Sequence, residues 1–101
     1  MKGEVVRPSE VLQKHRGLIR QIIEQGRLRN PRVFGSALRG DDQEGGDLDL
    51  LVDPDASTTP FDLGGVQCQL EELLGVRVHL LTARELPPRV RARVLRDAEP
   101  L

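Results

Sequence analysis

The sequence predicts a small α/β domain of the α+β kind, in which helices cover one side of a mixed sheet of about three to four strands. Three observations lead to this fold class. The chain has 101 residues, enough for one domain with a modest core. Short apolar runs bounded by Gly, Pro and Asp are typical of strands, and segments with apolar residues at helical spacing separate them. We therefore treat residues 1–101 as a single domain.

The first half of the chain predicts one long helix, one short strand and a loop. Ser9 is a good N-cap residue, the apolar residues after it recur on one helical face, and Gly26 is a natural stop. A buried strand follows and ends at Gly35. The expected elements are a helix over 9–25, a linker over 27–31, a strand over 32–34, a helical turn over 37–39 and an exposed loop over 40–46.

The second half predicts two further strands and two helices. Residues 48–52 are almost continuously apolar, which is typical of a central strand. Because a helix joins this strand to the next, the two are expected to be parallel, whereas the first two strands can pair either way. The expected elements are a strand over 48–52, a loop over 54–60, a helix over 61–74, a strand over 76–81 and a basic helix over 87–97.

Composition excludes several classes of protein. Phe34 and Phe61 are the only aromatic residues, so the stacking platforms of single-stranded nucleic-acid binders are not expected. Cys68 is the only cysteine, which excludes a disulfide framework within the chain. No apolar run approaches the roughly 20 residues of a membrane span, and no signal peptide is visible. We expect a cytoplasmic protein that binds neither membranes nor nucleic acid directly.

Charge is strongly segregated along the chain. Residues 1–40 carry nine Lys and Arg against three Asp and Glu, residues 41–75 carry ten Asp and Glu and no Lys or Arg, and residues 76–101 carry six Arg against three Asp and Glu. An acidic block between basic ends favours a divalent cation over a nucleic-acid backbone. The alternative is that the acidic residues merely solvate loops.

Residues 35–39 have the features of a phosphate-binding turn. Gly35 lets the backbone approach an anion closely, and Ser36 adds a hydroxyl and a backbone N–H group. Arg39 lies three residues after Ser36, on the same side of the expected helical turn, where it can pair with a phosphate oxygen. Taken alone, the Gly-Ser pair is equally compatible with an ordinary turn at the end of a strand.

Asp47 and Asp49 open the second strand and are expected to share one face of it, roughly 6.5–7 Å apart. Two such carboxylates suit Mg²⁺, which takes one or two carboxylates together with substrate phosphates. Alone, the pair is equally compatible with a capping residue and a solvated charge. The combination is more specific, because Gly-Ser ends one short strand and Asp-x-Asp opens the next after ten residues.

This combination resembles the minimal nucleotidyltransferases of the polymerase β superfamily, whose signature is Gly-Ser, a spacer and Asp-x-Asp. Here it reads Gly35-Ser36, residues 37–46, and Asp47-Leu48-Asp49. The resemblance implies a polymerase β-like nucleotidyltransferase fold. It also implies an antitoxin that transfers AMP from ATP onto a tyrosine of its partner, an RNase toxin with a HEPN domain. Gly35 and Ser36 would hold the triphosphate, and Asp47 and Asp49 would be catalytic and bind Mg²⁺.

The sequence departs from this family at one position. The third carboxylate of the superfamily lies in a Val-Asp-Leu context on the next strand, where this chain has Val78-His79-Leu80. Imidazole is a poor Mg²⁺ ligand beside carboxylate oxygens. His79 could instead accept a proton from an attacking hydroxyl, or it could mark a site without turnover. Asp41, Asp42, Glu44 and Asp55 are expected to solvate loops, and Asp53 is the first candidate for a replacement ligand.

Two hypotheses from different classes remain open at this point. The first is a Mg²⁺-dependent enzyme that transfers AMP from ATP to a hydroxyl of a HEPN-type toxin. The second is an inactive or weakly active antitoxin that neutralises its toxin by contact alone. The arginines of the expected last helix could dock such a partner, although they also suit a solvated helix face.

Overall fold

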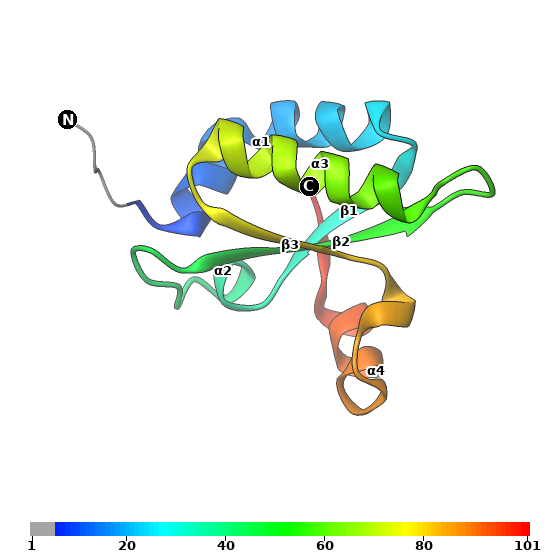
Figure 1. The fold of residues 1–101 in the computed structure, drawn as a ribbon. Helices are drawn as coiled ribbons and strands as arrows, with labels where there is room; N and C mark the ends of the chain where they lie inside the picture. Colours follow the sequence, from blue (N-terminus) through cyan, green and yellow to red (C-terminus); the bar gives the residue numbers. More distant parts are fainter. Residues whose placement is uncertain (1–5) are drawn as a thin grey trace.

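A four-stranded mixed sheet forms the centre of the molecule (Figure 1), with the strand order β3-β2-β1-β4. The structure is a computed structural model and describes residues 6–101. Its mixed sheet with packed helices confirms the predicted fold class. The strands are β1 (Leu28–Phe34), β2 (Asp47–Pro54), β3 (Arg77–Leu81) and β4 (Glu99–Pro100). The helices are α1 (Pro8–Gln25), α2 (Ser36–Arg39), α3 (Pro60–Leu74), the short 3-10 helix η1 (Ala83–Glu85) and α4 (Pro88–Asp97).

Two long helices, α1 and α3, cover one face of the sheet (Figure 1). Alternation along β2 directs Leu48, Leu50 and Val52 toward these helices, and all three are fully buried. They join the apolar faces of α1 and α3 in one core, to which the described residues contribute aliphatic side chains and no aromatic one. Burying each such side chain contributes roughly 1.5–3 kcal/mol.

The opposite side of the sheet carries α4 (Figure 1), so the expectation that helices cover one side only is wrong. The short helix α2 lies against the ends of β1 and β2, and its buried Ala37 joins the core beneath α1. Leu51 points away from the core and is nevertheless fully buried, and Leu86, just after η1, is also buried. β2 thus has buried residues on both of its faces, which explains why its sequence is apolar at nearly every position. This second face is the one that carries Asp47 and Asp49.

The strands pair in both senses around β2. β1 is antiparallel to β2, which settles the pairing that the sequence left open, and β2 is parallel to β3 as expected. The predicted linker over 27–31 is wrong, because β1 already begins at Leu28. An irregularity between Arg29 and Arg32, with Asn30 at a positive φ of 54°, interrupts the pairing there. Because a bulge inserts an extra residue and breaks the alternation of side chains, a search for a period of two in the sequence does not detect the first half of this strand.

The start of α1 also differs from the prediction. Arg7 occupies the N-cap position and Pro8 the first turn, so Ser9 lies inside the helix. The Ser9 backbone N–H donates to Asp42 Oδ2 at 2.7 Å and its hydroxyl donates to Asp42 Oδ1 at 2.9 Å. A carboxylate from a distant loop therefore accepts a hydrogen bond from a free N–H group in the first turn of α1.

Among the described residues, no helix has the length and apolar character to cross a membrane.

Candidate active site

Gly35 ends β1 and precedes α2 in a conformation that other residues rarely adopt, with φ 75° and ψ −152°. A β-carbon at this position would overlap Oδ2 of Asp49, because the Gly35 backbone passes directly against that carboxylate. Glycine is therefore required by its backbone angles, and any larger residue would also displace the Asp49 side chain. This contact joins the two halves of the predicted site, the Gly-Ser turn and the Asp-x-Asp strand.

The registers of β1, β2 and β3 bring the other predicted residues together. Asp49 lies between Phe34 of β1 and His79 of β3, and Asp47 lies two residues away on the same face. His79 Nε2 is 2.7 Å from Asp47 Oδ2. The imidazole of His79 therefore contacts the Asp47 carboxylate, and the backbone of His79 lies opposite that of Asp49.

This arrangement disfavours the ionised form of Asp49. Burial raises the pKa of its carboxyl, and His79 opposes that rise. The negative charge of Asp47 also raises the pKa, whereas Arg39 lowers it, and the net change is upward. Two close carboxylates, one of them half-buried, are destabilised as anions, and a bound cation would relieve that destabilisation.

The donor set of this site fits a magnesium ion that shares its ligands with a substrate. Within residues 6–101, no group of three His, Cys, Asp or Glu side chains could hold a metal ion. Asp47 and Asp49 supply two carboxylates on one face, and Mg²⁺ usually takes only one or two carboxylates, completing its shell with phosphates and water. A nucleotide would therefore supply the remaining oxygen ligands.

Ser36 and Arg39 both belong to the short helix α2. Ser36 is half-buried directly after Gly35, and Arg39 is exposed, with Nε 3.2 Å from Asp41 Oδ2. Arg39 also affects the pKa of Asp49, so its charge reaches the carboxylate pair. Asp47, Asp49 and His79 therefore share one face of the sheet, Gly35 lies against Asp49, and Arg39 is close enough for its charge to act on Asp49.

Asp53 and Asp42, two of the other acidic residues, both pair with arginines. Asp53 pairs with Arg32, which excludes it from the site. Asp42 was expected to be solvated, and this prediction is wrong: its side chain is fully buried and pairs with Arg7 at 2.8 Å.

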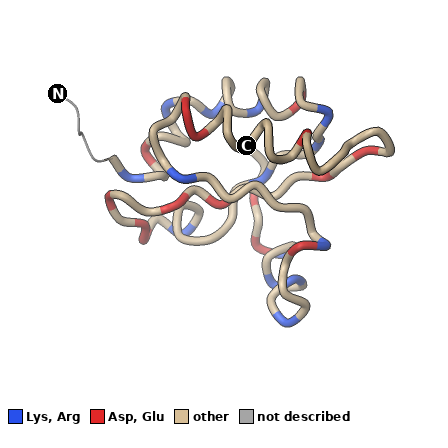
Figure 2. Tube along the Cα trace, viewed as in Figure 1, with Lys and Arg blue, Asp and Glu red and all other residues tan. Residues whose placement is uncertain are grey.

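Figure 2 shows acidic residues in the loop before β2 and along β2, and basic residues on α1 and α4. The segregation of charge in the sequence thus survives in the fold.

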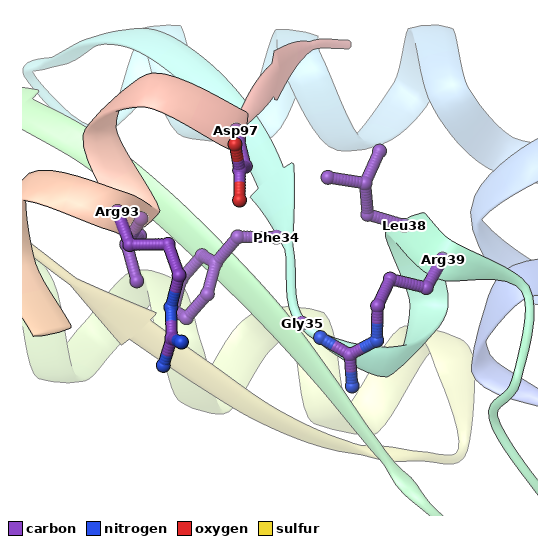
Figure 3. Close-up of a pocket in the computed structure, with 7 residues that line it drawn as sticks. Phe34, Gly35, Leu38, Arg39, Arg93 and Asp97 are labelled. Carbon is purple, nitrogen blue, oxygen red and sulfur yellow. The ribbon is translucent and has the colours of Figure 1, made fainter.

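Sequence reasoning missed the contribution of α4 to this region. A cavity of about 390 Å³ lies beside Gly35 and Arg39, and its second wall comes from α4 (Figure 3). The arginines of α4 were considered only as a partner surface or a solvated face. Arg91 is neither, since its guanidinium donates to the carbonyls of Ala83, Arg84 and Leu86. The cavity is lined by Phe34, Gly35, Leu38, Arg39, Arg93, Val94 and Asp97.

The fold and the Gly-Ser and Asp-x-Asp elements together define a minimal nucleotidyltransferase. A solved structure assigned as a minimal nucleotidyltransferase superimposes with a TM-score of 0.82 at 41% identity, covering 92% of this chain and 95% of that one. The profile of the Nucleotidyltransferase domain family matches residues 15–100. The chain belongs to this family of enzymes.

Its curated relatives carry a more specific name. A Methanocaldococcus jannaschii protein assigned as a protein adenylyltransferase is 31% identical over 82% of this chain and 88% of its own length. The protein adenylyltransferase MntA of Thermococcus cleftensis is 33% identical over 77% of this chain and 79% of its own length. The fold is also shared with a chain in a solved structure of tri-AMPylated Shewanella oneidensis HEPN toxin in complex with MNT antitoxin, at a TM-score of 0.65 and 17% identity, covering 87% of this chain and 69% of that one.

Proposed function

We propose that this protein is a Mg²⁺-dependent adenylyltransferase that transfers AMP from ATP to a hydroxyl of a HEPN-domain toxin in the cytoplasm and so acts as an antitoxin. The observation that carries the proposal is the contact of the Gly35 backbone with the Asp49 carboxylate, beside the Asp47–His79 pair. It brings an anion-binding turn and a pair of metal-binding groups to one point. The names of the relatives support the choice of a protein as the acceptor.

Each site residue has a role in this reaction. Gly35 leaves room for the triphosphate, and Ser36 and Arg39 donate hydrogen bonds to its oxygens. Asp47 and Asp49 hold Mg²⁺, which supplies neutralisation of charge on the phosphates when it is bound. The acceptor oxygen forms a bond to the α-phosphorus, and the bond from that phosphorus to the bridging oxygen of the β-phosphate breaks. Pyrophosphate leaves, and the acceptor keeps AMP.

His79 has two roles in the proposal. Its hydrogen bond orients Asp47, because a carboxylate held from one side loses rotational freedom. Its imidazole is also the candidate that accepts the proton of the attacking hydroxyl. The residue is exposed, so an acceptor side chain from a partner can approach it.

A second candidate function is neutralisation by contact alone. It is favoured by one observation, the imidazole at the position where the superfamily has its third carboxylate. In this case the chain would bind its toxin without modifying it, and Asp47 and Asp49 would be dispensable for neutralisation.

Mass spectrometry of a HEPN-domain toxin incubated with this protein, ATP and Mg²⁺ separates the two candidates. The enzyme adds the mass of one or more AMP groups to the toxin, and Asp47→Asn or Asp49→Asn abolishes the addition. Asp53→Asn is the matched control, since Asp53 lies on the same strand and face but pairs with Arg32. Transfer that persists in both Asp variants would refute the proposed mechanism. Neutralisation without any transfer would establish the contact-only antitoxin.

A further inference from the structure

The cavity beside the Gly-Ser turn has walls from two distant parts of the chain. One wall comes from Gly35, Leu38 and Arg39, and the other from Arg93, Val94 and Asp97 of α4. Its volume of about 390 Å³ falls within the range of small-molecule sites, roughly 300–1,000 Å³. Gly35 belongs to both the cavity and the proposed phosphate site, so the two adjoin each other at this residue.

The cavity carries two guanidinium groups. In Figure 3, the heads of Arg39 and Arg93 point in the same direction, with Gly35 and Phe34 between them in the view. Arg39 is paired with Asp41 at 3.2 Å. Within residues 6–101, Arg93 has no ion-pair partner, since the neighbouring Asp97 pairs with Arg96 instead. The α4 wall therefore presents a cation whose donors are free for a ligand.

We propose that Arg93 is a second cationic ligand of the nucleotide's phosphates, placed opposite Arg39 across the cavity. This inference rests on the proposed function and extends it to a residue outside the Gly-Ser and Asp-x-Asp elements. A guanidinium suits a polyphosphate because its planar fork donates to two oxygens at once. The phosphate chain passes Gly35, with Arg39 on one side and Arg93 on the other. In this arrangement α4 completes the site.

Isothermal titration calorimetry with two ligands tests the assignment. ATP and inorganic tripolyphosphate, each with Mg²⁺, are titrated into the wild-type protein and into Arg93→Ala, Arg93→Lys and Arg89→Ala. Arg89→Ala is the matched control, because Arg89 lies on the same helix and is exposed but does not line the cavity. Circular dichroism of each variant checks that α4 remains folded.

The expected result is that Arg93→Ala weakens both ligands by roughly tenfold or more, the loss of a hydrogen bond to a charged group. Arg93→Lys loses less, because it keeps the charge without the fork, and Arg89→Ala binds as the wild type does. Equal binding of tripolyphosphate by wild type and Arg93→Ala would overturn the inference. So would a loss confined to ATP, which would assign the cavity to the nucleoside.

Calorimetry combined with the mass-spectrometric transfer assay distinguishes this inference from the proposed function. Phosphate binding that depends on Arg93, in a protein that transfers no AMP, would contradict the proposed function and leave the Arg93 assignment intact. AMP transfer that Arg93→Ala leaves unchanged, together with unchanged binding, would contradict only the assignment. A wild-type protein that binds neither ligand would overturn both.

Discussion

His79 Nε2 lies 2.7 Å from Asp47 Oδ2, so the imidazole on β3 contacts the first carboxylate of the Asp-x-Asp element. In the proposed site, the residue at the position where the resemblance implies a third carboxylate would instead hold Asp47 in place. The proposed metal site would then keep its geometry with two carboxylates.

His79→Ala is expected to lower metal-dependent AMP transfer roughly 10- to 100-fold, because residues that orient metal ligands have effects of about this size. His79→Asp is expected to lower the Mg²⁺ concentration needed for half-maximal transfer, since it restores a carboxylate beside Asp47 and Asp49. Transfer rates measured over a range of Mg²⁺ concentrations check both. Wild-type activity in His79→Ala would remove any role of the imidazole in the reaction.

Gly35→Ala is expected to destabilise the protein more than Gly40→Ala does. Both glycines have positive φ, but Gly40 (ψ 10°) is left-handed helical, where alanine costs about 1–2 kcal/mol, whereas Gly35 (ψ −152°) lies in a region essentially restricted to glycine, where strain is about 1–3 kcal/mol. Only at Gly35 does the new β-carbon meet Asp49, whereas nothing lies within 4 Å at Gly40. Urea unfolding gives the two free energies, and Mg²⁺ titration is expected to show weaker binding for Gly35→Ala alone. Equal losses in stability and unchanged metal binding would contradict the close approach of Gly35 and Asp49.

Asp42→Asn is expected to lower the free energy of unfolding by about 1–3 kcal/mol, because it removes charge-assisted bonds to Arg7 and to the first turn of α1. Asp41→Asn is the matched control in the same loop. Its carboxylate is exposed, so its loss is expected to change stability by less than about 1 kcal/mol. Thermal or urea unfolding at neutral pH distinguishes the two variants, and similar losses would contradict the buried role of Asp42.

The same carboxylate predicts a dependence of stability on pH. Burial raises the pKa of Asp42, but the hydrogen bonds from Ser9 and the charge of Arg7 outweigh it, so the folded-state pKa lies below 3.8. A lowered pKa means that Asp42 contributes its full stability above the unfolded-state value and loses it as pH falls through the folded-state value. Unfolding curves collected from neutral pH into the acid range are expected to converge for wild type and Asp42→Asn. A constant difference between them would contradict this linkage.

Arg91→Ala is expected to weaken nucleotide binding without touching the nucleotide. Its guanidinium donates to the carbonyls of Ala83 and Leu86 at 2.8 and 2.9 Å, which ties the start of α4 to the turn after β3. Loss of these bonds loosens the wall that carries Arg93. We expect a several-fold weaker affinity for ATP in calorimetry, reversed in part by a stabilising osmolyte. An affinity equal to that of wild type would show that α4 keeps its place without Arg91.

The sequence was most informative where contacts are local or follow from alternation. Asp47 and Asp49 share a face because a strand has a period of two, and a helix between two strands predicts that β2 and β3 run parallel. Their position against Gly35 follows once β1 and β2 pair. The shared face and the parallel pairing were predicted, whereas the antiparallel pairing of β1 with β2, which brings Asp49 against Gly35, was left open by the sequence.

Long-range contacts account for what could not be predicted. Ser9 was an acceptable cap on its own, but Asp42, which is 33 residues away, takes over the first turn of α1. The bulge after Arg29 concealed half of β1. The exposed arginines of α4 gave no sign that Arg93 would face Gly35. In each case the deciding partner is distant in sequence, and no local pattern encodes it.

The two sides of the proposed site are held with unequal strength. β2, which carries Asp47 and Asp49, is central and fully buried along much of its length, whereas α4, which carries Arg93, has no buried residue and is anchored by Arg91 and by the short strand β4. Elements of this kind open at lower free energy than the core. Backbone amides of α4 should therefore exchange with deuterium well before those of β2. Exchange that opens the Arg93 wall while the carboxylates keep their places would give a nucleotide a route in and pyrophosphate a route out, without unfolding of the sheet.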